Sequence, residues 1–280
     1  MGRVTTATLM EMKARGEKMT MLTAYDYPTA VLLDEAGIDM LLVGDSVGNV
    51  VLGYEDTLPV TMDEMIHHTR AVARGTRRAM VVGDMPFLSY QASLPEAILN
   101  AGRFLKEGGA QAVKLEGGSE RASVVRALVE TGIPVMGHLG LTPQSVHQLG
   151  GFRVQGRDEA AARRLLDSAL VLEEAGVFAL VLEAVPAALA AQVTSRLQVP
   201  TIGIGAGPDC DGQVLVVHDM LGLSARRVPK FVRQYASLGD IVKEAVRAYQ
   251  ADVKDGSFPA PEHCYCYDKP KAEAQPSLAR

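Results

Sequence analysis

Four segments of the chain repeat one pattern of hydrophobic and polar positions. Each has a glutamate, any residue, a glycine, an aliphatic run and then a polar or ionisable residue. The segments are EAGIDMLLVGD (35–45), EGGAQAVKLE (107–116), ETGIPVMGH (130–138) and EAGVFALVLE (174–183). Each glycine follows an amphipathic stretch and can adopt the left-handed conformation that ends a helix. The pattern therefore predicts a helix, a glycine cap, a buried strand and a functional group at the end of that strand.

Aliphatic runs of strand length occur eight times along the chain. They are nearly continuous rather than alternating, which is typical of parallel strands covered on both faces. The runs lie at 19–26, 38–45, 79–84, 110–116, 133–138, 177–183, 199–207 and 213–219. Eight strands alternating with helices in about 250 residues predict a (β/α)8 TIM barrel. Because only about five residues separate the last two runs, fewer than a parallel crossover normally needs, a doubly wound open sheet remains the alternative.

Polar residues that favour helix starts support the alternation of strands and helices. We expect caps or capping boxes at Thr8 with Glu11, Thr61 with Glu64, Ser93 with Glu96, Ser119 and Asp158. The first of these helices would close the bottom of the barrel. A further helix is expected from about Leu223 to Lys254. We predict a single barrel domain over residues 1–258 and a polar C-terminal tail over residues 259–280.

Composition and charge narrow the class of partner. The chain has 280 residues, a formal net charge of −5 and no stretch dense in lysine and arginine, which argues against nucleic acid or a membrane surface. No apolar run approaches membrane-spanning length, and three cysteines are too few for a disulfide framework. We therefore expect a cytoplasmic protein that acts on small molecules.

Ionisable residues end most of the predicted strands. They are Asp26, Asp45, Asp84, Glu116, His138, Glu183 and the pair His218 and Asp219. Any one acid at such a position can simply cap the next helix. Several carboxylates at the mouth of one barrel repel one another unless a cation compensates, and their hard oxygens favour Mg²⁺. One ligand on each of three successive units then predicts a metal site formed by Asp45, Asp84 and Glu116.

Three other residues at the strand ends suggest roles beside a metal. Lys114 lies two residues before Glu116 and so shares its face of the strand, where it can pair with carboxylates or bind an anionic substrate. Glu183 ends an apolar strand, which would raise its pKa and suit it to proton transfer near neutral pH. His138 either donates to an oxyanion or is a hydrogen-bonded core histidine.

The segment GIGAGP (203–208) has two of the glycines of a dinucleotide-binding fingerprint. The third glycine of that fingerprint would fall at Pro208, and no capped helix with an acid some twenty residues on is evident. We interpret the segment as flexible backbone at the mouth of the seventh strand.

The chain resembles the ketopantoate hydroxymethyltransferase family over residues 5 to 258. The resemblance rests on LTAYDYPTA, GDSVGNVVLGYEDTLPVTMDEMIHHTRAV, GDMPFLSYQ, VKLEGG, PVMGHLGLTPQSVHQLGGFRVQG, TIGIGAGPDCDGQVLVVHD and PKFVRQYA. It implies a barrel of the phosphoenolpyruvate/pyruvate type, Mg²⁺, and transfer of a hydroxymethyl group from the co-substrate 5,10-methylenetetrahydrofolate to 3-methyl-2-oxobutanoate in pantothenate biosynthesis. It also implies a large homo-oligomer, commonly a decamer.

Residue by residue, the resemblance implies a site that agrees with the strand-end pattern. Asp45, Asp84 and Glu116 match the metal positions, and Glu183 matches the proton acceptor. The substrate contacts implied are Asp45, Ser46, Asp84, Lys114 and His138. The expected chemistry is a Mg²⁺-stabilised enolate of the keto acid that attacks the folate methylene. The alternatives are a Mg²⁺-dependent 2-oxo acid C–C lyase on the same barrel and a non-catalytic keto-acid sensor.

Overall fold

The computed structural model describes residues 2–224 and 228–266. In these residues the strands form one closed barrel in chain order, and every neighbouring pair is parallel. The strands are β1 (Met19–Thr23), β2 (Met40–Val43), β3 (Met80–Asp84), β4 (Ala112–Glu116), β5 (Val135–Gly140), β6 (Ala179–Glu183), β7 (Thr201–Ile204) and β8 (Gly212–Leu215). The pairing of β1 with β8, with Met21 opposite Val214, closes the barrel. It confirms the predicted (β/α)8 class and excludes the open sheet.

The short connection between β7 and β8 contains no helix, yet the two strands pair in parallel, with Ile202 opposite Gly212. A single carboxylate holds this connection in place. Asp211 accepts hydrogen bonds from the amide of Thr201 at 2.8 Å and from the ammonium of Lys13 at 2.8 Å. These bonds tie the residue before β8 to the start of β7 and to the N-terminal helix.

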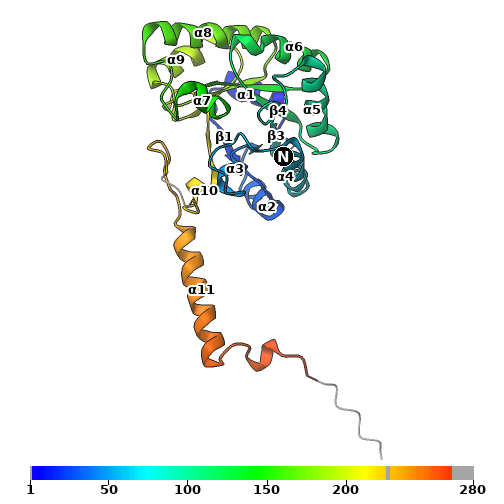
Figure 1. Cartoon of the computed structure of the whole chain (residues 1–280), viewed down its shortest axis with the longest axis vertical. Helices are drawn as coiled ribbons and strands as arrows, with labels where there is room; N and C mark the ends of the chain where they lie inside the picture. The colour runs from blue at the N-terminus through cyan, green and yellow to red at the C-terminus, as the bar shows by residue number, and fades with distance from the viewer. Residues whose placement is uncertain (1, 225–227, 267–280) are drawn as a thin grey trace, which may run out of the picture. The chain divides into compact units, whose positions relative to one another are not determined.

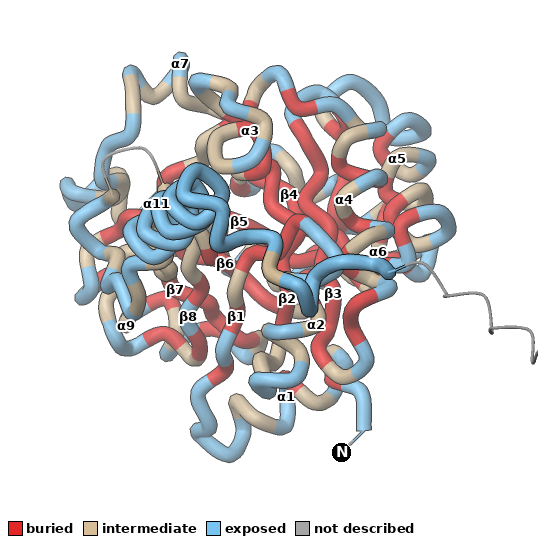
Figure 2. The backbone as a smooth tube through the Cα atoms, turned by 90° about the horizontal axis from the view of Figure 1, so that it is seen from below, coloured by how far each residue is buried: buried red, intermediate tan, exposed pale blue. Residues whose placement is uncertain are grey.

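Helices follow most strands and, in Figure 2, surround a buried centre of strands. The α-helices of the first 224 residues are α1 (Thr6–Ala14), α2 (Tyr27–Glu35), α3 (Val47–Val50), α4 (Met62–Gly75), α5 (Leu94–Lys106), α6 (Ala122–Glu130), α7 (Val146–Leu149), α8 (Glu159–Glu174), α9 (Ala187–Arg196) and α10 (Val217–Met220). Two 3-10 turns, η1 (Ser119–Arg121) and η2 (Pro143–Ser145), precede α6 and α7. The four glycines of the repeated pattern all have positive φ, from 76° to 102°, as their predicted capping role requires.

Some predicted helix starts are confirmed and others are wrong. Thr61 and Glu64 form the expected capping box of α4, and the side chains of Ser93 and Asp158 cap α5 and α8. The capping box of α1 instead joins Thr5 to Thr8, because Thr5 is the last residue with extended backbone. Ser119 begins the η1 turn, and α6 starts only after it.

The apolar core has two parts, one inside the barrel and one between strands and helices. The interior part includes Leu9 of α1 together with Met19, Met40 and Met80 from three strands, each at most 1% exposed. The outer part gathers the residues of alternate parity, such as Val81 and Val113, against the surrounding helices. Leu9 thus packs on the interior residues at the N-terminal ends of the strands, as a helix that closes the bottom would.

The chain divides into two compact units, Met1–Ala236 and Ser237–Arg280. In the described part of the second unit, α11 (Leu238–Asp255) has no buried residue and is followed by the turn η3 (Pro261–His263) (Figure 1). The prediction of a helix from about Leu223 was wrong. Pro229 disfavours helical backbone at the preceding residue, and the helix begins only at Leu238.

Within the described residues no helix is both long and apolar enough to cross a membrane. The predicted tail boundary at residue 258 stays a prediction, and its last residues, 267–280, lie outside the described part of the chain.

Candidate active site

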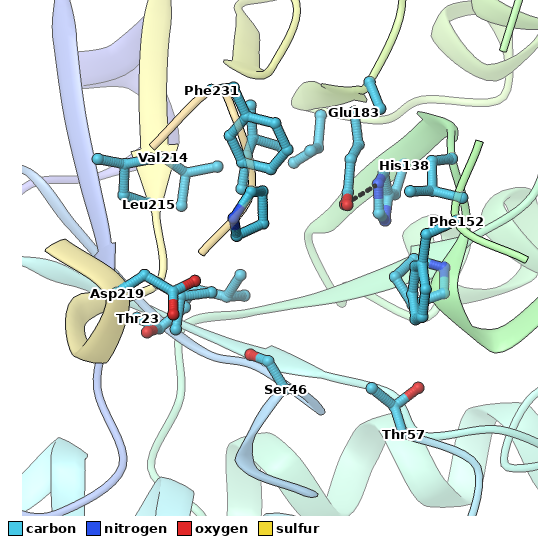
Figure 3. A pocket seen from close by; sticks show the side chains of 18 of the residues that line it. Thr23, Ser46, Thr57, His138, Phe152, Glu183, Val214, Leu215, Asp219 and Phe231 are labelled. Atoms are coloured by element: carbon cyan, nitrogen blue, oxygen red, sulfur yellow. Dashed lines mark ion pairs between the residues drawn. The ribbon is translucent and has the colours of Figure 1, made fainter. Parts of the chain in front are cut away.

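A cavity of about 490 Å³ opens at the carboxyl ends of the barrel strands (Figure 3). It is contained in the first unit. Every site residue predicted from the sequence lines it, namely Asp45, Ser46, Asp84, Lys114, Glu116, His138 and Glu183. Residues as far as 138 positions apart in sequence therefore meet at one place.

Strand alternation turns these side chains into the barrel. In β3, Asp84 follows the interior residue Val82 by two positions, and in β6, Glu183 follows the interior residue Val181 in the same way. Successive side chains of a strand point to opposite faces, so residues two apart share a face. The strand register then places Asp84 opposite Lys114 and Glu116 opposite His138. An acidic group thus faces a basic group between β3 and β4 and again between β4 and β5.

Three carboxylates and one ammonium group form the buried floor of the site. The ammonium of Lys114 lies 2.8 Å from Asp84 Oδ1 and 3.9 Å from Glu116 Oε1. The amide of Asp45 donates to Asp84 Oδ2 at 3.2 Å. All four residues are at most 4% exposed, so each charge depends on its neighbours rather than on water.

The pKa shifts show that the acids outnumber the cation. Burial, and then the charges of Asp84 and Glu116, raise the pKa of Asp45 well above its ordinary value. Burial also raises the pKa of Asp84, although the Lys114 charge opposes it. Burial lowers the pKa of Lys114, but the three carboxylates outweigh it and the net direction is upward. The ammonium is therefore held protonated, and at least one carboxylate is short of a compensating cation.

His138 joins the buried floor to a carboxylate at the edge of the cavity. Its Nδ1 lies 3.4 Å from Glu116 Oε1, and its Nε2 lies 3.2 Å from Glu183 Oε2. Burial and the Lys114 charge lower the pKa of His138, but the contacts with Glu116 and Glu183 outweigh them and raise it to about 9. The Glu183 side chain is 17% exposed, unlike the floor carboxylates. Glu183 is therefore the acid that can reach a ligand in the cavity while a histidine orients it.

A buried glutamine that sequence reasoning missed braces the floor. Gln144, in η2 after β5, donates from Nε2 to Asp45 Oδ2 at 3.0 Å and to the Met85 carbonyl at 2.9 Å. Its backbone amide donates to Glu116 Oε2 at 3.0 Å, and Oε1 accepts from the Tyr90 hydroxyl at 2.7 Å. Gln144 thus orients two carboxylates at once. Nothing in its polar loop sequence distinguishes it from a surface glutamine.

Comparison with known proteins identifies the family of enzymes to which this site belongs. A family model described as ketopantoate hydroxymethyltransferase matches residues 3–261. The chain belongs to this family. A 3-methyl-2-oxobutanoate hydroxymethyltransferase of Moorella thermoacetica is 64% identical over 263 residues, which are 94% of this chain and 98% of the relative. The enzyme of the same name from Carboxydothermus hydrogenoformans is 61% identical and covers 95% of this chain and 96% of its own. The predicted family is confirmed, and the chain is a hydroxymethyltransferase.

Solved structures of low sequence identity share the barrel of this family. Phosphonopyruvate hydrolase matches with a TM-score of 0.62 and 12% identity over 94% of this chain and 93% of that chain. A 2,3-dimethylmalate lyase, a member of the PEP mutase/isocitrate lyase superfamily, matches with a TM-score of 0.59 and 17% identity over 92% of both chains. These matches show that the chain shares the barrel fold of those enzymes.

Other ionisable residues of the strand-end pattern have different roles in this hydroxymethyltransferase. Asp26 accepts a hydrogen bond from the Thr29 amide at 2.8 Å and caps α2, so its capping interpretation is confirmed. Asp219 lines the cavity and lies near Thr23 in Figure 3. Ser46 receives support from a buried residue that sequence reasoning missed, because the Tyr25 hydroxyl lies 2.8 Å from Ser46 Oγ.

The floor residues fit a hard divalent cation by their donor chemistry. Asp84 Oδ1 and Glu116 Oε1 are buried and have no partner in hydrogen-bond geometry among the described residues, although Lys114 is near both. The described residues contain no three acidic, histidine or cysteine side chains already arranged around one ion. Mg²⁺ commonly takes one or two carboxylates and completes its octahedron with water and substrate oxygens. The donor set fits that pattern better than an all-protein cage.

Proposed function

We propose that the chain transfers a hydroxymethyl group from 5,10-methylenetetrahydrofolate to 3-methyl-2-oxobutanoate, which gives ketopantoate and tetrahydrofolate for pantothenate biosynthesis. Membership of the hydroxymethyltransferase family supports the reaction class. The observation that carries the proposal is the convergence of a buried acid and lysine floor with a partly exposed Glu183 in one cavity. A 2-oxo acid needs a cationic contact for its carboxylate and a base at C3, and this arrangement supplies both.

In this proposal the keto acid binds with its carboxylate toward the Lys114 ammonium and the Ser46 hydroxyl. Lys114 is protonated because the surrounding carboxylates raise its pKa, and the Tyr25 hydroxyl orients Ser46. Asp45, Asp84 and Glu116 are the groups that would hold Mg²⁺, directly or through water. Bound there, Mg²⁺ would supply a Lewis acid for the negative charge that develops on the keto oxygen.

Glu183 is the proposed base of the first step. Its carboxylate takes the C3 proton of the keto acid, and the electron pair of that C–H bond becomes the enolate. His138 Nε2 lies 3.2 Å from Glu183 Oε2, and the charge of the protonated ring attracts the carboxylate and keeps it turned into the cavity. The methylene carbon is bonded to two folate nitrogens, and the enolate carbon forms a bond to it as the first of these carbon–nitrogen bonds breaks. Water supplies the hydroxyl group as the second carbon–nitrogen bond breaks, which leaves the hydroxymethyl group on C3. The two nitrogens of the released tetrahydrofolate take up the proton that Glu183 removed and one proton from the water.

Hydrogen exchange at C3 in deuterated water tests this assignment, because it requires the base but not the folate. We expect Glu183→Gln to bind the keto acid and to lose exchange by roughly 10²- to 10⁴-fold, which is the range for loss of a general base. Glu174→Gln, an exposed acid at the end of α8, is the matched control and should exchange like wild type. Exchange at the wild-type rate in Glu183→Gln would remove Glu183 from this role.

The lyase alternative, a 2-oxo acid C–C lyase on the same barrel, has less support. Lyases of the isocitrate lyase type use a cysteine on a catalytic loop, and the first cysteine of this chain, Cys210, comes only after the seventh strand. A keto-acid sensor would have no use for Glu183 as a base. Turnover of 3-methyl-2-oxobutanoate together with methylenetetrahydrofolate, followed by product analysis, separates the transferase from the lyase.

We further propose that the enzyme works in the cytoplasm as a homo-oligomer, as the resemblance implies. The observation in favour of assembly is α11, whose apolar residues are exposed within its own unit. They include Ile241, Val242, Val246, Tyr249 and Val253. Light scattering on the full chain gives the oligomeric state directly, and a monomer at micromolar concentration would contradict this proposal.

A further inference from the structure

The cavity is larger than a five-carbon keto acid requires, and residues around its opening have no part in the proposed proton transfer. A volume of about 490 Å³ is in the range of pockets that hold drug-sized ligands. Four of these lining residues are Phe152, Arg153, Lys230 and Phe231. We call them the rim. They come from the segment after α7 and from the segment before α11.

The two rim phenylalanines expose their rings although neither is on a helix or a strand. Phe152 is 63% exposed and Phe231 is 38% exposed, and the cavity lining also includes the apolar residues Val154 and Leu215. In Figure 3 the two rings lie on either side of the Glu183 carboxylate. A flat ligand that contacts both rings would therefore lie over the proposed base.

A glycine of the GIGAGP segment positions the Phe231 ring. A Cβ atom at Gly205 would lie 2.7 Å from Phe231 Cδ1, so the ring rests against bare backbone at the end of β7. Gly205 also has a φ of +63°, which a residue with a side chain rarely adopts. The close approach of the Phe231 ring therefore explains why a glycine is needed at position 205 of the GIGAGP segment, although this segment is not a dinucleotide-binding motif.

The two rim cations have no ion-pair partner among residues 2–224 and 228–266. Arg153 and Lys230 are exposed, and neither side chain makes an ion pair with any residue that the structure describes. The chain as a whole carries a formal net charge of −5. Two neighbouring cations beside the cavity are therefore not expected from the composition alone. They provide a site for an anionic group at the entrance, separate from the Lys114 ammonium at the floor.

We propose that the rim binds the one-carbon donor, with the reduced pterin and aminobenzoyl rings against Phe152 and Phe231 and the glutamate carboxylates at Arg153 and Lys230. This inference rests on the proposed function. The occupant follows from charge and shape, because the donor is flat, aromatic and anionic at one end. The keto acid has no ring, and its carboxylate is matched at the floor. The methylene between the two ring systems of the donor would then face the C3 carbon beside Glu183.

The test separates the two substrates of the reaction. Phe152→Leu and Phe231→Leu keep an apolar side chain and remove the ring. Since stacking on an aromatic side chain strengthens binding of flat heterocycles, we expect each to raise the KM for methylenetetrahydrofolate roughly tenfold. The KM for the keto acid and the rate of C3 exchange without folate should stay at wild-type values. Phe87→Leu, with the same 38% exposure as Phe231 but outside the cavity lining, is the matched control.

An unchanged KM for methylenetetrahydrofolate in both leucine variants would overturn the proposal. So would an equal rise in the KM for both substrates, since this would indicate general damage to the cavity. Direct binding of tetrahydrofolate, measured by calorimetry, distinguishes this failure from failure of the proposed function. If tetrahydrofolate binds more weakly to the leucine variants but wild type shows no turnover, the rim proposal holds and the transferase reaction is rejected. If tetrahydrofolate binds equally to wild type and to the leucine variants, the rim proposal is rejected.

A charge variant tests the tail of the donor separately. Arg153→Gln combined with Lys230→Gln should abolish any preference for triglutamyl over monoglutamyl methylenetetrahydrofolate, a ratio of KM values that we expect to be roughly tenfold in wild type at low salt. Raising the ionic strength should reduce the wild-type ratio in the same way. Arg163→Gln, an exposed cation on α8, is the control and should keep the ratio. A wild-type ratio in the double variant would contradict the role of the two cations.

Discussion

The lower and upper halves of the barrel interior lie on the same strands and have opposite chemistry. In the lower half, methionines and other apolar residues pack on one another and on Leu9 of α1. In the upper half, only two residues further along, Asp84, Lys114 and His138 take the same inward positions. Both halves are almost entirely shielded from water. Burial of apolar side chains in the lower half stabilises the fold. Burial of charged side chains in the upper half lowers the stability of the fold, but it places reactive groups in the cavity.

The largest expected effect comes from removing the cation of the upper half. Lys114→Met keeps the length of the side chain but leaves Asp84 without its ammonium partner at 2.8 Å. Unpairing a buried charge costs about 3–5 kcal/mol of unfolding free energy. Loss of a positioned cation should also lower kcat by roughly 10²- to 10³-fold. Urea denaturation and steady-state turnover measure the two effects.

The pH dependence of that stability difference has a definite sign. The folded pKa of Lys114 is raised, so its stabilising contribution is fully present below the unfolded lysine pKa of about 10.4 and is lost as the pH rises through the folded value. The difference between wild type and Lys114→Met should therefore be complete at neutral pH. A variant as stable and as active as wild type would show that the upper half does not depend on this cation.

The matching change in the lower half should affect stability alone. Met80 is 1% exposed in the interior core, and Met80→Ala leaves a cavity that costs about 2–5 kcal/mol. Because Met80 lies four residues before Asp84 on β3, we expect kcat and both KM values to stay at wild-type values at a temperature where the variant is folded. Thermal melting and turnover at low temperature check this. A large change in kcat would mean that the two halves are coupled.

Loss of the Gln144 brace should disturb the upper half without removing a charge. Gln144→Met removes the hydrogen bond to Asp45 and the acceptor for Tyr90, so the carboxylates lose their fixed orientation. Groups that orient metal ligands typically contribute a factor of about 10–100 in metal affinity. Calorimetric titration with Mg²⁺ or Mn²⁺ measures this without relying on activity. Gln192→Met, exposed on α9, is the control. Equal affinity in the two variants would rule out the brace.

The smallest expected effect is a gain in stability. Burial and the neighbouring carboxylates raise the folded pKa of Asp45, so its charge destabilises the fold as the pH rises from the unfolded value of about 3.9 through the folded value. Asp45→Asn should stabilise the metal-free protein at neutral pH, because it removes a buried charge that the fold disfavours. It should also abolish stabilisation by Mg²⁺. Thermal melting with and without Mg²⁺ tests both, and a less stable metal-free variant would contradict the charge imbalance.

Local features of the sequence predicted much of the fold and of the site. Aliphatic runs and glycine caps such as Gly37 and Gly176 depend on residues a few positions apart, so their pattern indicates strands and helix ends directly. The positions of Asp45, Asp84 and Glu183 at strand ends could be predicted for the same reason, because each residue lies at the end of an aliphatic run. The start of α11 was predicted wrongly at about Leu223, because Pro229 disfavours helical backbone at the residue before it and the helix begins only at Leu238.

The sequence by itself determined which residues end the strands and which face of each strand they occupy, because strand alternation has a period of two residues. Only the tertiary structure decided that β8 pairs with β1, that Gln144 and Tyr90 hold the floor, and that Phe231 rests on Gly205. Each of these contacts joins segments 26 or more positions apart in sequence. They form only when the barrel closes, because hydrogen-bond partners and packing partners across a closed barrel are set by strand register and not by local spacing.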